Sequence, residues 1–217
     1  MVHTVVIAGG AGSGKSMVAQ CFVTLGIPVL SADRYVAALL EQNSPVFDAI
    51  VTHFKPLLGQ EPIVLAGELN KSGIRHIILQ SVADRLWLEQ LLHPLVLASL
   101  HRETQALQNV PYCVWEIPLL GKSGLRQSAK GMHYIDHIAI DRIILVDTPD
   151  DVRIQRIMMR DQVPAQAAEA MLQVQDQRTW LLQQADDVIE GTLAPEALQA
   201  KVRMLDEAYR VAFSEKT

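Results

Sequence analysis

The sequence has few cysteines, no long apolar run and no basic leader. Its two cysteines, Cys21 and Cys113, lie far apart in apolar surroundings, which predicts buried thiols in a reducing compartment and no disulfide. The longest apolar runs are far shorter than the ~20 residues that a membrane span needs. The N-terminus shows neither a basic segment nor a small-residue cleavage site. We therefore expect no signal peptide, no membrane partner and a cytoplasmic location.

A positive charge excess is also missing. The chain carries 24 acidic and 19 basic residues, interspersed, for a net charge of −5. Because no basic stripe marks a nucleic-acid footprint, we expect no nucleic-acid partner. The apolar share of 49% over 217 residues is sufficient for one compact α/β domain that can hold a smaller inserted subdomain. The composition therefore favours a globular protein. We expect a monomer with at most weak self-association.

The first thirty residues alternate between strand and helix patterns. Residues 5–8 form a short apolar run typical of a buried parallel strand, and residues 27–30 form a second one. Between them, apolar residues recur at helical spacing up to Leu25, and Gly26 follows where a helix end favours positive φ. Strand, loop, helix and strand make a βαβ unit with a right-handed crossover. We therefore predict an α/β fold whose core is a parallel β-sheet flanked by helices.

The following stretch is mainly helical. Ser44 with Pro45 predicts a helix N-cap and first turn, and Pro94 predicts a break between two helices. Only residues 63–65 interrupt the helical pattern, with a turn at Ala66-Gly67. We therefore predict a core domain over 1–35 and 109–217, and an inserted helical substrate-binding subdomain over 36–108.

Strand and helix patterns alternate again in the last hundred residues. Strands are predicted over 112–117, 142–146 and 188–189; helices over 149–160 (capped by Thr148), over 164–184 and from Pro195 onward; and a surface loop over 121–137. His133 and His137 fall in that loop, and without a third ligand they predict no metal site.

The strongest functional signal lies directly after the first strand, in the order Gly9, Gly10, Ala11, Gly12, Ser13, Gly14, Lys15, Ser16. This segment, the phosphate loop, matches G-x-x-x-x-G-K-[ST] between a strand and a helix. Its glycines let successive N–H groups point at phosphate oxygens, and the helix N-terminus adds partial positive charge. Lys15 is expected to reach the β- and γ-phosphates, and the Ser16 hydroxyl to coordinate the metal. The loop therefore predicts binding of ATP with Mg²⁺.

Asp33 follows the second strand, at the sheet edge where open α/β folds bind ligands. Its carboxylate could accept a proton from a substrate hydroxyl or help to hold magnesium. Asp is also a favoured N-cap, here for a helix that begins at Arg34. Position alone leaves these alternatives open.

In these residues the chain resembles the dephospho-coenzyme A kinase family. The resemblance runs in order through the phosphate loop; Leu25 to Val29 with Ala32-Asp33; Leu69-Asn70-Lys71 and Ile74-Arg75; Leu92-His93-Pro94; Pro118-Leu119-Leu120; Arg156, Met158, Arg160 and Asp161; Gln175; and Ala185 to Ile189. Thousands of unrelated NTPases share the loop alone, whereas the ordered set is specific.

The resemblance implies transfer of the γ-phosphoryl group of ATP to the ribose 3′-hydroxyl of dephospho-CoA. It places Asp33 at the position of the base. It places Arg156 and Arg160 in a mobile helical lid over about residues 156–180, where guanidinium groups suit phosphate oxygens.

The resemblance also suggests substrate contacts, at Arg75, His93, Pro118 and Leu119. Arg75 could instead pair with a nearby acid, and His93 could be a helix-end histidine bonded to carbonyls. Glu116 either lies near the bound magnesium or only meets solvent at the sheet edge, and Trp180 is either a partly buried residue or an adenine contact.

The chain departs from the family pattern at five positions. It has Ser31 and Lys122 where the family has acids, and Ala37 where the family has a basic residue. It has Met171 in place of an arginine and Glu190 in place of an asparagine. Two other functions stay open. One is a shikimate- or gluconate-type kinase, whose chains lack the His-Pro and Pro-Leu-Leu landmarks. The other is a divergent relative acting as a nucleotide-binding switch, although no Asp-x-x-Gly or Asn-Lys-x-Asp motif supports it.

Overall fold

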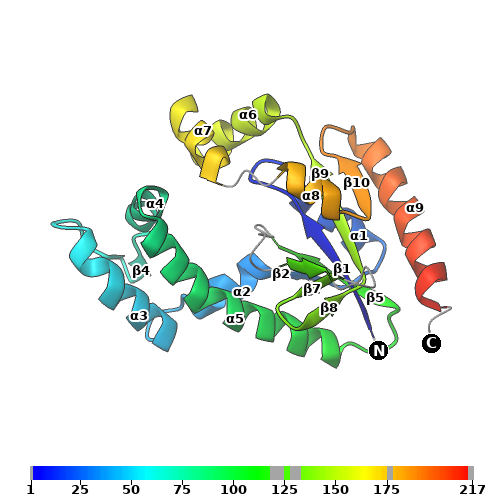
Figure 1. Ribbon diagram of the computed structural model, residues 1–217, viewed down its shortest axis with the longest axis horizontal. Coiled ribbons are helices and arrows are strands. Elements are labelled where there is room, and N and C mark those ends of the chain that lie inside the picture. Colours follow the sequence, from blue (N-terminus) through cyan, green and yellow to red (C-terminus); the bar gives the residue numbers. More distant parts are fainter. Residues whose placement is uncertain (1, 118–124, 128–132, 175–177, 215–217) are drawn as a thin grey trace. The chain divides into compact units, whose positions relative to one another are not determined.

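A computed structural model describes residues 2–117, 125–127, 133–174 and 178–214 (Figure 1). The chain divides into two compact units: the core unit (Met1–Ser31 and His101–Thr217) and the helical unit (Ala32–Leu100). These boundaries fall earlier than the predicted ones, which followed residues 35 and 108. At the second boundary the end of a long helix belongs to the core unit, since the indole Nε1 of Trp115 donates to Thr104 Oγ1 at 2.8 Å.

The core unit is built on a five-stranded parallel sheet. In spatial order its strands are β10 (Asp187–Glu190), β9 (Arg142–Asp147), β1 (His3–Ala8), β5 (Tyr112–Glu116) and β2 (Val29–Ser31). Residues 5–8 of β1 are fully buried, which explains why this strand is a continuous apolar run. The predicted α/β class with a parallel core is confirmed.

Two helices lie side by side and share one apolar cluster with the sheet: α1 (Lys15–Thr24) and α9 (Pro195–Ser214) (Figure 1). Helical spacing places Val18 and Phe22 of α1 on the buried face, together with Val202 and Tyr209 of α9. Gly26 follows α1 with φ 77°, as the sequence predicted for a helix end.

Three more helices of the core unit are α6 (Asp150–Asp161), α7 (Ala165–Val174) and α8 (Arg178–Gln184). Residues 175–177 between α7 and α8 lie outside the described residues, so the single helix predicted over 164–184 stays a prediction. The predicted cap of α6 is wrong: Pro149 occupies the N-cap position without a side-chain bond, and the Thr148 hydroxyl bonds elsewhere. Helices α6 and α7 pack through the fully buried Ile157 and Ala168.

A small antiparallel sheet includes part of the surface loop predicted over 121–137, of which residues 121–124 and 128–132 lie outside the described ranges. Its strands are β6 (Leu125–Gln127), β7 (His133–Ile135) and β8 (Ile138–Ile140). Alternate residues of β7 and β8 are buried, among them Ile135 and Ile140. His133 is therefore a buried strand residue, while His137 lies exposed in the turn. The strands were missed because three residues are too few for a clear period of two.

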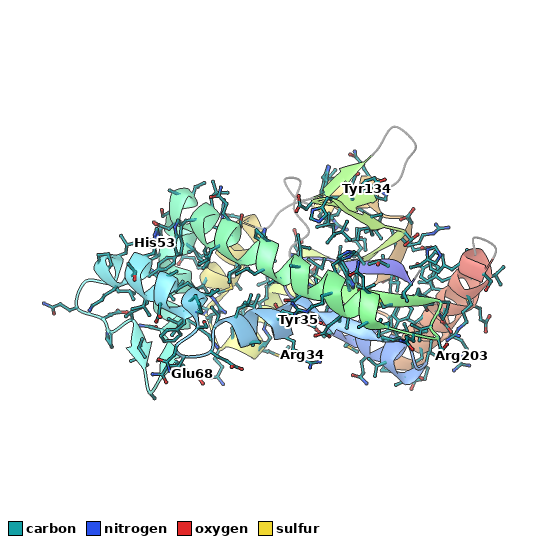
Figure 2. The ribbon with its side chains drawn as sticks, turned by 90° about the horizontal axis from the view of Figure 1, so that it is seen from below. Arg34, Tyr35, His53, Glu68, Tyr134 and Arg203 are labelled. Carbon is teal, nitrogen blue, oxygen red and sulfur yellow. The ribbon has the colours of Figure 1, made fainter. Side chains whose placement is uncertain are left out.

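The helical unit begins with α2 (Ala32–Leu39), α3 (Pro45–Phe54) and a 3₁₀ turn (Lys55–Leu57). A hairpin of β3 (Val64–Leu65) and β4 (Glu68–Leu69) follows, and then α4 (Lys71–Gln80). Figure 2 labels Arg34 and Tyr35 on α2, His53 on α3 and Glu68 on β4. The predicted cap at Ser44 is confirmed, since the Phe47 amide donates to Ser44 Oγ at 3.0 Å.

Helix α5 (Val82–Ala106) runs from the helical unit into the core unit without interruption. Pro94 lies inside it, so the predicted break at His93-Pro94 is wrong. Proline removes one hydrogen bond, but apolar residues continue the helical period on both sides, with Leu91 packed in the unit's core and Val96 buried beyond the proline. Among the described residues, no helix combines the length and apolar character needed to cross a membrane.

Candidate active site

The phosphate loop connects β1 to α1, as predicted. Gly12 and Gly14 have φ of 73° and 97°, a conformation that side chains disfavour. A Cβ at Gly12 would also lie 2.7 Å from the backbone oxygen of Arg153. Helix α1 begins at Lys15, so its N-terminus faces the end of the loop. This backbone presents the partial positive charge that binds phosphate groups.

Lys15 and Ser16 start α1 and point back to the sheet edge. The Lys15 ammonium donates to the carbonyls of Gly9 and Gly10, at 2.7 and 3.0 Å. The Ser16 hydroxyl donates to Glu116 Oε1 at 2.6 Å. Parallel pairing of Ile7 with Glu116 explains this contact, because it brings the end of β5 beside the start of the loop. Of the two alternatives for Glu116, its bond to Ser16 favours a place in the metal site.

A hydroxyl and a carboxylate are the oxygen donors that Mg²⁺ prefers, and this ion usually takes one or two protein carboxylates and keeps several waters. Ser16 and Glu116 therefore fit a magnesium site that phosphate oxygens complete. Within the described ranges, no group of three or more His, Cys, Asp or Glu side chains is positioned to hold a metal ion. The donor set thus matches a metal that arrives with a nucleotide.

Helix α6 and Thr148, two residues before its start, contact the loop from its carbonyl side. Arg153 Nε donates to Ala11 O at 3.0 Å, and Thr148 Oγ1 donates to Ser13 O at 2.8 Å. Arg156 donates to Gly12 O at 3.1 Å and to Gly191 O at 2.9 Å. Arg156 is therefore bonded to the phosphate loop in this structure.

The two arginines predicted for the lid are in different environments. Arg156 is half-buried against the loop, whereas the Arg160 side chain is 62% exposed and donates two hydrogen bonds to the Asp161 carboxylate. A third arginine, Arg178 at the start of α8, donates to both oxygens of Asp147 at 2.6 and 2.9 Å. These bonds lower the pKa of the Asp147 carboxyl below its ordinary value.

The other predicted residues lie in the helical unit or outside the described ranges. Asp33 is exposed in the first turn of α2, so it is not the N-cap of a helix starting at Arg34. Arg75 and His93 are exposed on α4 and α5. Pro118 and Leu119 lie outside the described residues, as do Leu120, Lys122 and Gln175.

Sequence reasoning missed three residues of this site: Thr148, Arg153 and Arg178. Arg153 precedes Arg156 by three positions, so helical spacing alone could have placed both on one face of α6. Thr148 looked like a helix cap, and only the structure shows that its hydroxyl serves the loop instead. Arg178 fell within the helix predicted over 164–184, and no motif singled it out.

Comparison with known proteins agrees with this geometry. The family model described as dephospho-CoA kinase matches residues 3–194. The chain belongs to the dephospho-CoA kinase family. The dephospho-CoA kinase of Salmonella typhimurium is 35% identical over 209 residues, covering 96% of this chain and 94% of that protein. That of Coxiella burnetii is 38% identical over 183 residues, covering 84% of each.

A solved structure of dephospho-CoA kinase from Campylobacter jejuni shares the fold. Its TM-score is 0.64 at 22% identity, with 98% of this chain and 100% of that chain covered. Family membership makes the chain an ATP-dependent kinase with the P-loop fold. The matches favour the dephospho-CoA kinase function over the shikimate-type and switch alternatives.

Proposed function

We propose that the protein transfers the γ-phosphoryl group of ATP to the ribose 3′-hydroxyl of dephospho-CoA, giving coenzyme A and ADP. The observation that carries this proposal is the phosphate loop with its Lys15 and Ser16–Glu116 contacts, in a chain of the dephospho-CoA kinase family. The identity of the acceptor, dephospho-CoA, is inferred from the names of the relatives.

The core unit supplies the phosphate chemistry. The loop N–H groups and the Lys15 ammonium would bind the β- and γ-phosphates and stabilise the charge that develops during transfer. Ser16, with Glu116 beside it, would hold the Mg²⁺ that neutralises phosphate charge when bound. Arg178 lies at the same edge of the sheet, held by Asp147.

The helical unit supplies the acceptor side. Asp33 would accept the proton of the 3′-hydroxyl, and its exposed position in the first turn of α2 leaves the carboxylate accessible. Arg75 and His93, together with Pro118 and Leu119, would bind the substrate. The exposed Arg75 guanidinium suits a phosphate group of the acceptor.

The lid was predicted over about residues 156–180. Because Arg156 is bonded to the loop, we propose that α6 stays with the loop and that movement starts beyond it. Gln162 ends α6 with φ 53°, and Pro164 follows, which suits a hinge. Arg160 lies on α6 before this hinge, at its exposed end, so it would stay in place and contact phosphates only once the closing lid encloses them. Slower protease cleavage after residue 162 with both substrates bound would support this, and equal cleavage would contradict it.

We propose that the protein acts as a cytoplasmic monomer on this small-molecule substrate. Cys21 and Cys113 are both free thiols, which is the usual state of cysteine in a reducing compartment. Light scattering at increasing protein concentration tests the monomer.

The central experiment is mass spectrometry of dephospho-CoA incubated with the protein and Mg-ATP. We expect a gain of one phosphate, together with ADP release that requires the acceptor. ADP release at the same rate without dephospho-CoA would instead indicate a hydrolase or switch and would overturn the proposal.

A further inference from the structure

Three consecutive carbonyls of the phosphate loop accept hydrogen bonds from one side. The carbonyl of Ala11 accepts from Arg153, that of Gly12 from Arg156, and that of Ser13 from the Thr148 hydroxyl. Two of these donors are guanidinium groups, whose hydrogen bonds are stronger than those between neutral groups. We call this set of donors the carbonyl clamp.

The clamp determines where the loop's amides point. In a planar trans peptide, the C=O and the following N–H point in opposite directions. With the Ala11 and Ser13 carbonyls held by the clamp, the amides of Gly12 and Gly14 face the opposite side. The Ser13 amide between them closes a turn onto Gly10 O at 3.2 Å. The clamp therefore keeps the N–H groups of Gly12 and Gly14 directed toward the side of the loop where phosphate oxygens would bind.

Arg153 is the most enclosed member of the clamp that carries a charge. Its side chain is 7% exposed and pairs with Asp150 at 3.0 Å, which balances its charge. Its Nη2 atom would lie 2.0 Å from a Cβ placed on Gly10, so the guanidinium covers this glycine closely. The Ala11 methyl also packs against the apolar cluster of α6 and α7. Arg153 thus fixes the segment Gly10-Ala11 through both a charged hydrogen bond and close packing.

The loop after β10 completes the clamp on its far side. The Gly191 amide donates to Asp147 O at 2.7 Å, and its carbonyl accepts from Arg156 at 2.9 Å. A Cβ at Gly191 would lie 2.0 Å from Thr148 Oγ1 and 2.2 Å from Ser13 O. This close approach leaves the Thr148 hydroxyl little freedom to turn away from the Ser13 carbonyl.

We propose that Arg153 and Thr148 are positioning residues for phosphoryl transfer, because they hold the phosphate loop in its phosphate-binding conformation without touching the phosphates. This inference rests on nucleotide binding as proposed above and is independent of the identity of the acceptor. It assigns to the start of α6 a role in nucleotide affinity.

The first test measures binding of Mg-ADP by calorimetry for Arg153→Met and Arg153→Ala. Loss of one charged hydrogen bond to the loop is expected to weaken binding ~10- to 100-fold. KM for ATP should rise in parallel, whereas KM for dephospho-CoA should stay within about twofold. Arg203→Ala is the matched control, since Arg203 is exposed on α9 of the same unit (Figure 2). ADP affinity of the Arg153 variants within twofold of this control would overturn the proposal.

A second test separates positioning from a general loss of structure. Gly10→Ala should displace the Arg153 guanidinium and weaken Mg-ADP binding in the unaltered protein. In the Arg153→Ala background the same change should weaken binding much less, because the obstructing group is gone. Fully additive effects would show that the Gly10–Arg153 contact does not position the loop.

Thr148 provides a third test, in which no buried charged side chain is removed. Thr148→Val keeps the shape but removes the donor to Ser13 O, and should weaken Mg-ADP binding about tenfold or less. Thr148→Ser keeps the hydroxyl and should retain most of the affinity. Equal affinity of the two variants would count against the clamp.

The unaltered protein distinguishes the two proposals. If it bound no Mg-ADP, both the proposed function and the positioning role would fail. If it bound Mg-ADP but did not phosphorylate dephospho-CoA, only the proposed acceptor would be overturned.

Discussion

The phosphate loop of the core unit and the helical unit differ in how their proposed functional residues are arranged. The loop places eight consecutive residues around one backbone turn, and its glycines and helix start determine the geometry locally. In the helical unit, Asp33, Arg75 and His93 lie on three separate helices and are all exposed. A contiguous motif carries its own geometry, whereas residues spread over several helices depend on packing for theirs.

The largest effect is expected from the loop itself. Lys15→Ala removes the ammonium that stabilises charge on the transferring phosphoryl group, so turnover should fall at least ~100-fold. The melting temperature should change little, because the Lys15 ammonium donates to two carbonyls of its own loop. Steady-state kinetics with saturating ATP measures this, with Lys201→Ala on α9 as control. Unchanged turnover would contradict the kinase site.

A change at Asp33 in the helical unit tests whether a residue outside the contiguous motif affects turnover as strongly as Lys15. Asp33→Asn keeps the size of the side chain but loses proton-accepting capacity, so phosphoryl transfer should fall by ~100-fold. Mg-ADP binding should persist, since the loop is untouched. Asp33→Asn and Asp33→Ala both remove a first-turn acid, which costs about 0.3–1 kcal/mol of helix stability. An active Asn variant would show that the base lies elsewhere.

Arg156 and Arg160, both on α6, sharpen the contrast within one helix. Arg156→Ala should weaken Mg-ADP binding ~10-fold or more, because Gly12 O and Gly191 O lose a charged donor. Arg160→Ala should leave ADP affinity close to normal and reduce turnover ~10-fold or less, because Arg160 would act only in the closed lid. Calorimetry and kinetics on both variants measure the difference. If both lost ADP affinity equally, the division between loop-bound and lid arginines would be wrong.

The smallest effect concerns pH and the helical unit alone. Bonds from Ser81 and His53 lower the pKa of Asp84. A lowered pKa stabilises the folded form above the ordinary value of ~3.9, and this stability is lost as pH falls through the folded pKa. Asp84→Asn should therefore flatten the acid side of the melting profile. Trp87, stacked on the His53 ring at 3.8 Å, gives a fluorescence signal for it. An unchanged profile between pH 3 and 6 would show that this pair adds no pH dependence.

Much of the core unit could be predicted from the sequence because its signals are local. The apolar run of β1, the loop motif and Gly26 each determine structure over a few residues. The small sheet could not be predicted from the sequence, because β6 to β8 are short and are stabilised by pairing between strands. Pro94 misled for a related reason: packing on both sides keeps α5 continuous.

The site shows the same limit. Lys15 and Ser16 followed from their motif, but the bond of Ser16 to Glu116 depends on the register of two strands a hundred residues apart in sequence. Thr148 had two plausible hydrogen-bond partners, an amide donor of its own helix and a carbonyl acceptor of the loop, and only the close approach of Gly191 and Ser13 decides between them. Roles set by such tertiary contacts are not visible in residue order.

The hydrogen bonds of Lys15 to Gly9 and Gly10 have a thermodynamic consequence. A free lysine side chain loses up to ~2 kcal/mol of rotamer entropy when it is ordered. In the free protein this ordering is already complete, so nucleotide binding need not include it. We therefore expect the entropy of Mg-ADP binding to be less unfavourable than for a flexible lysine, and the association rate to be governed by diffusion and not by rearrangement of the loop.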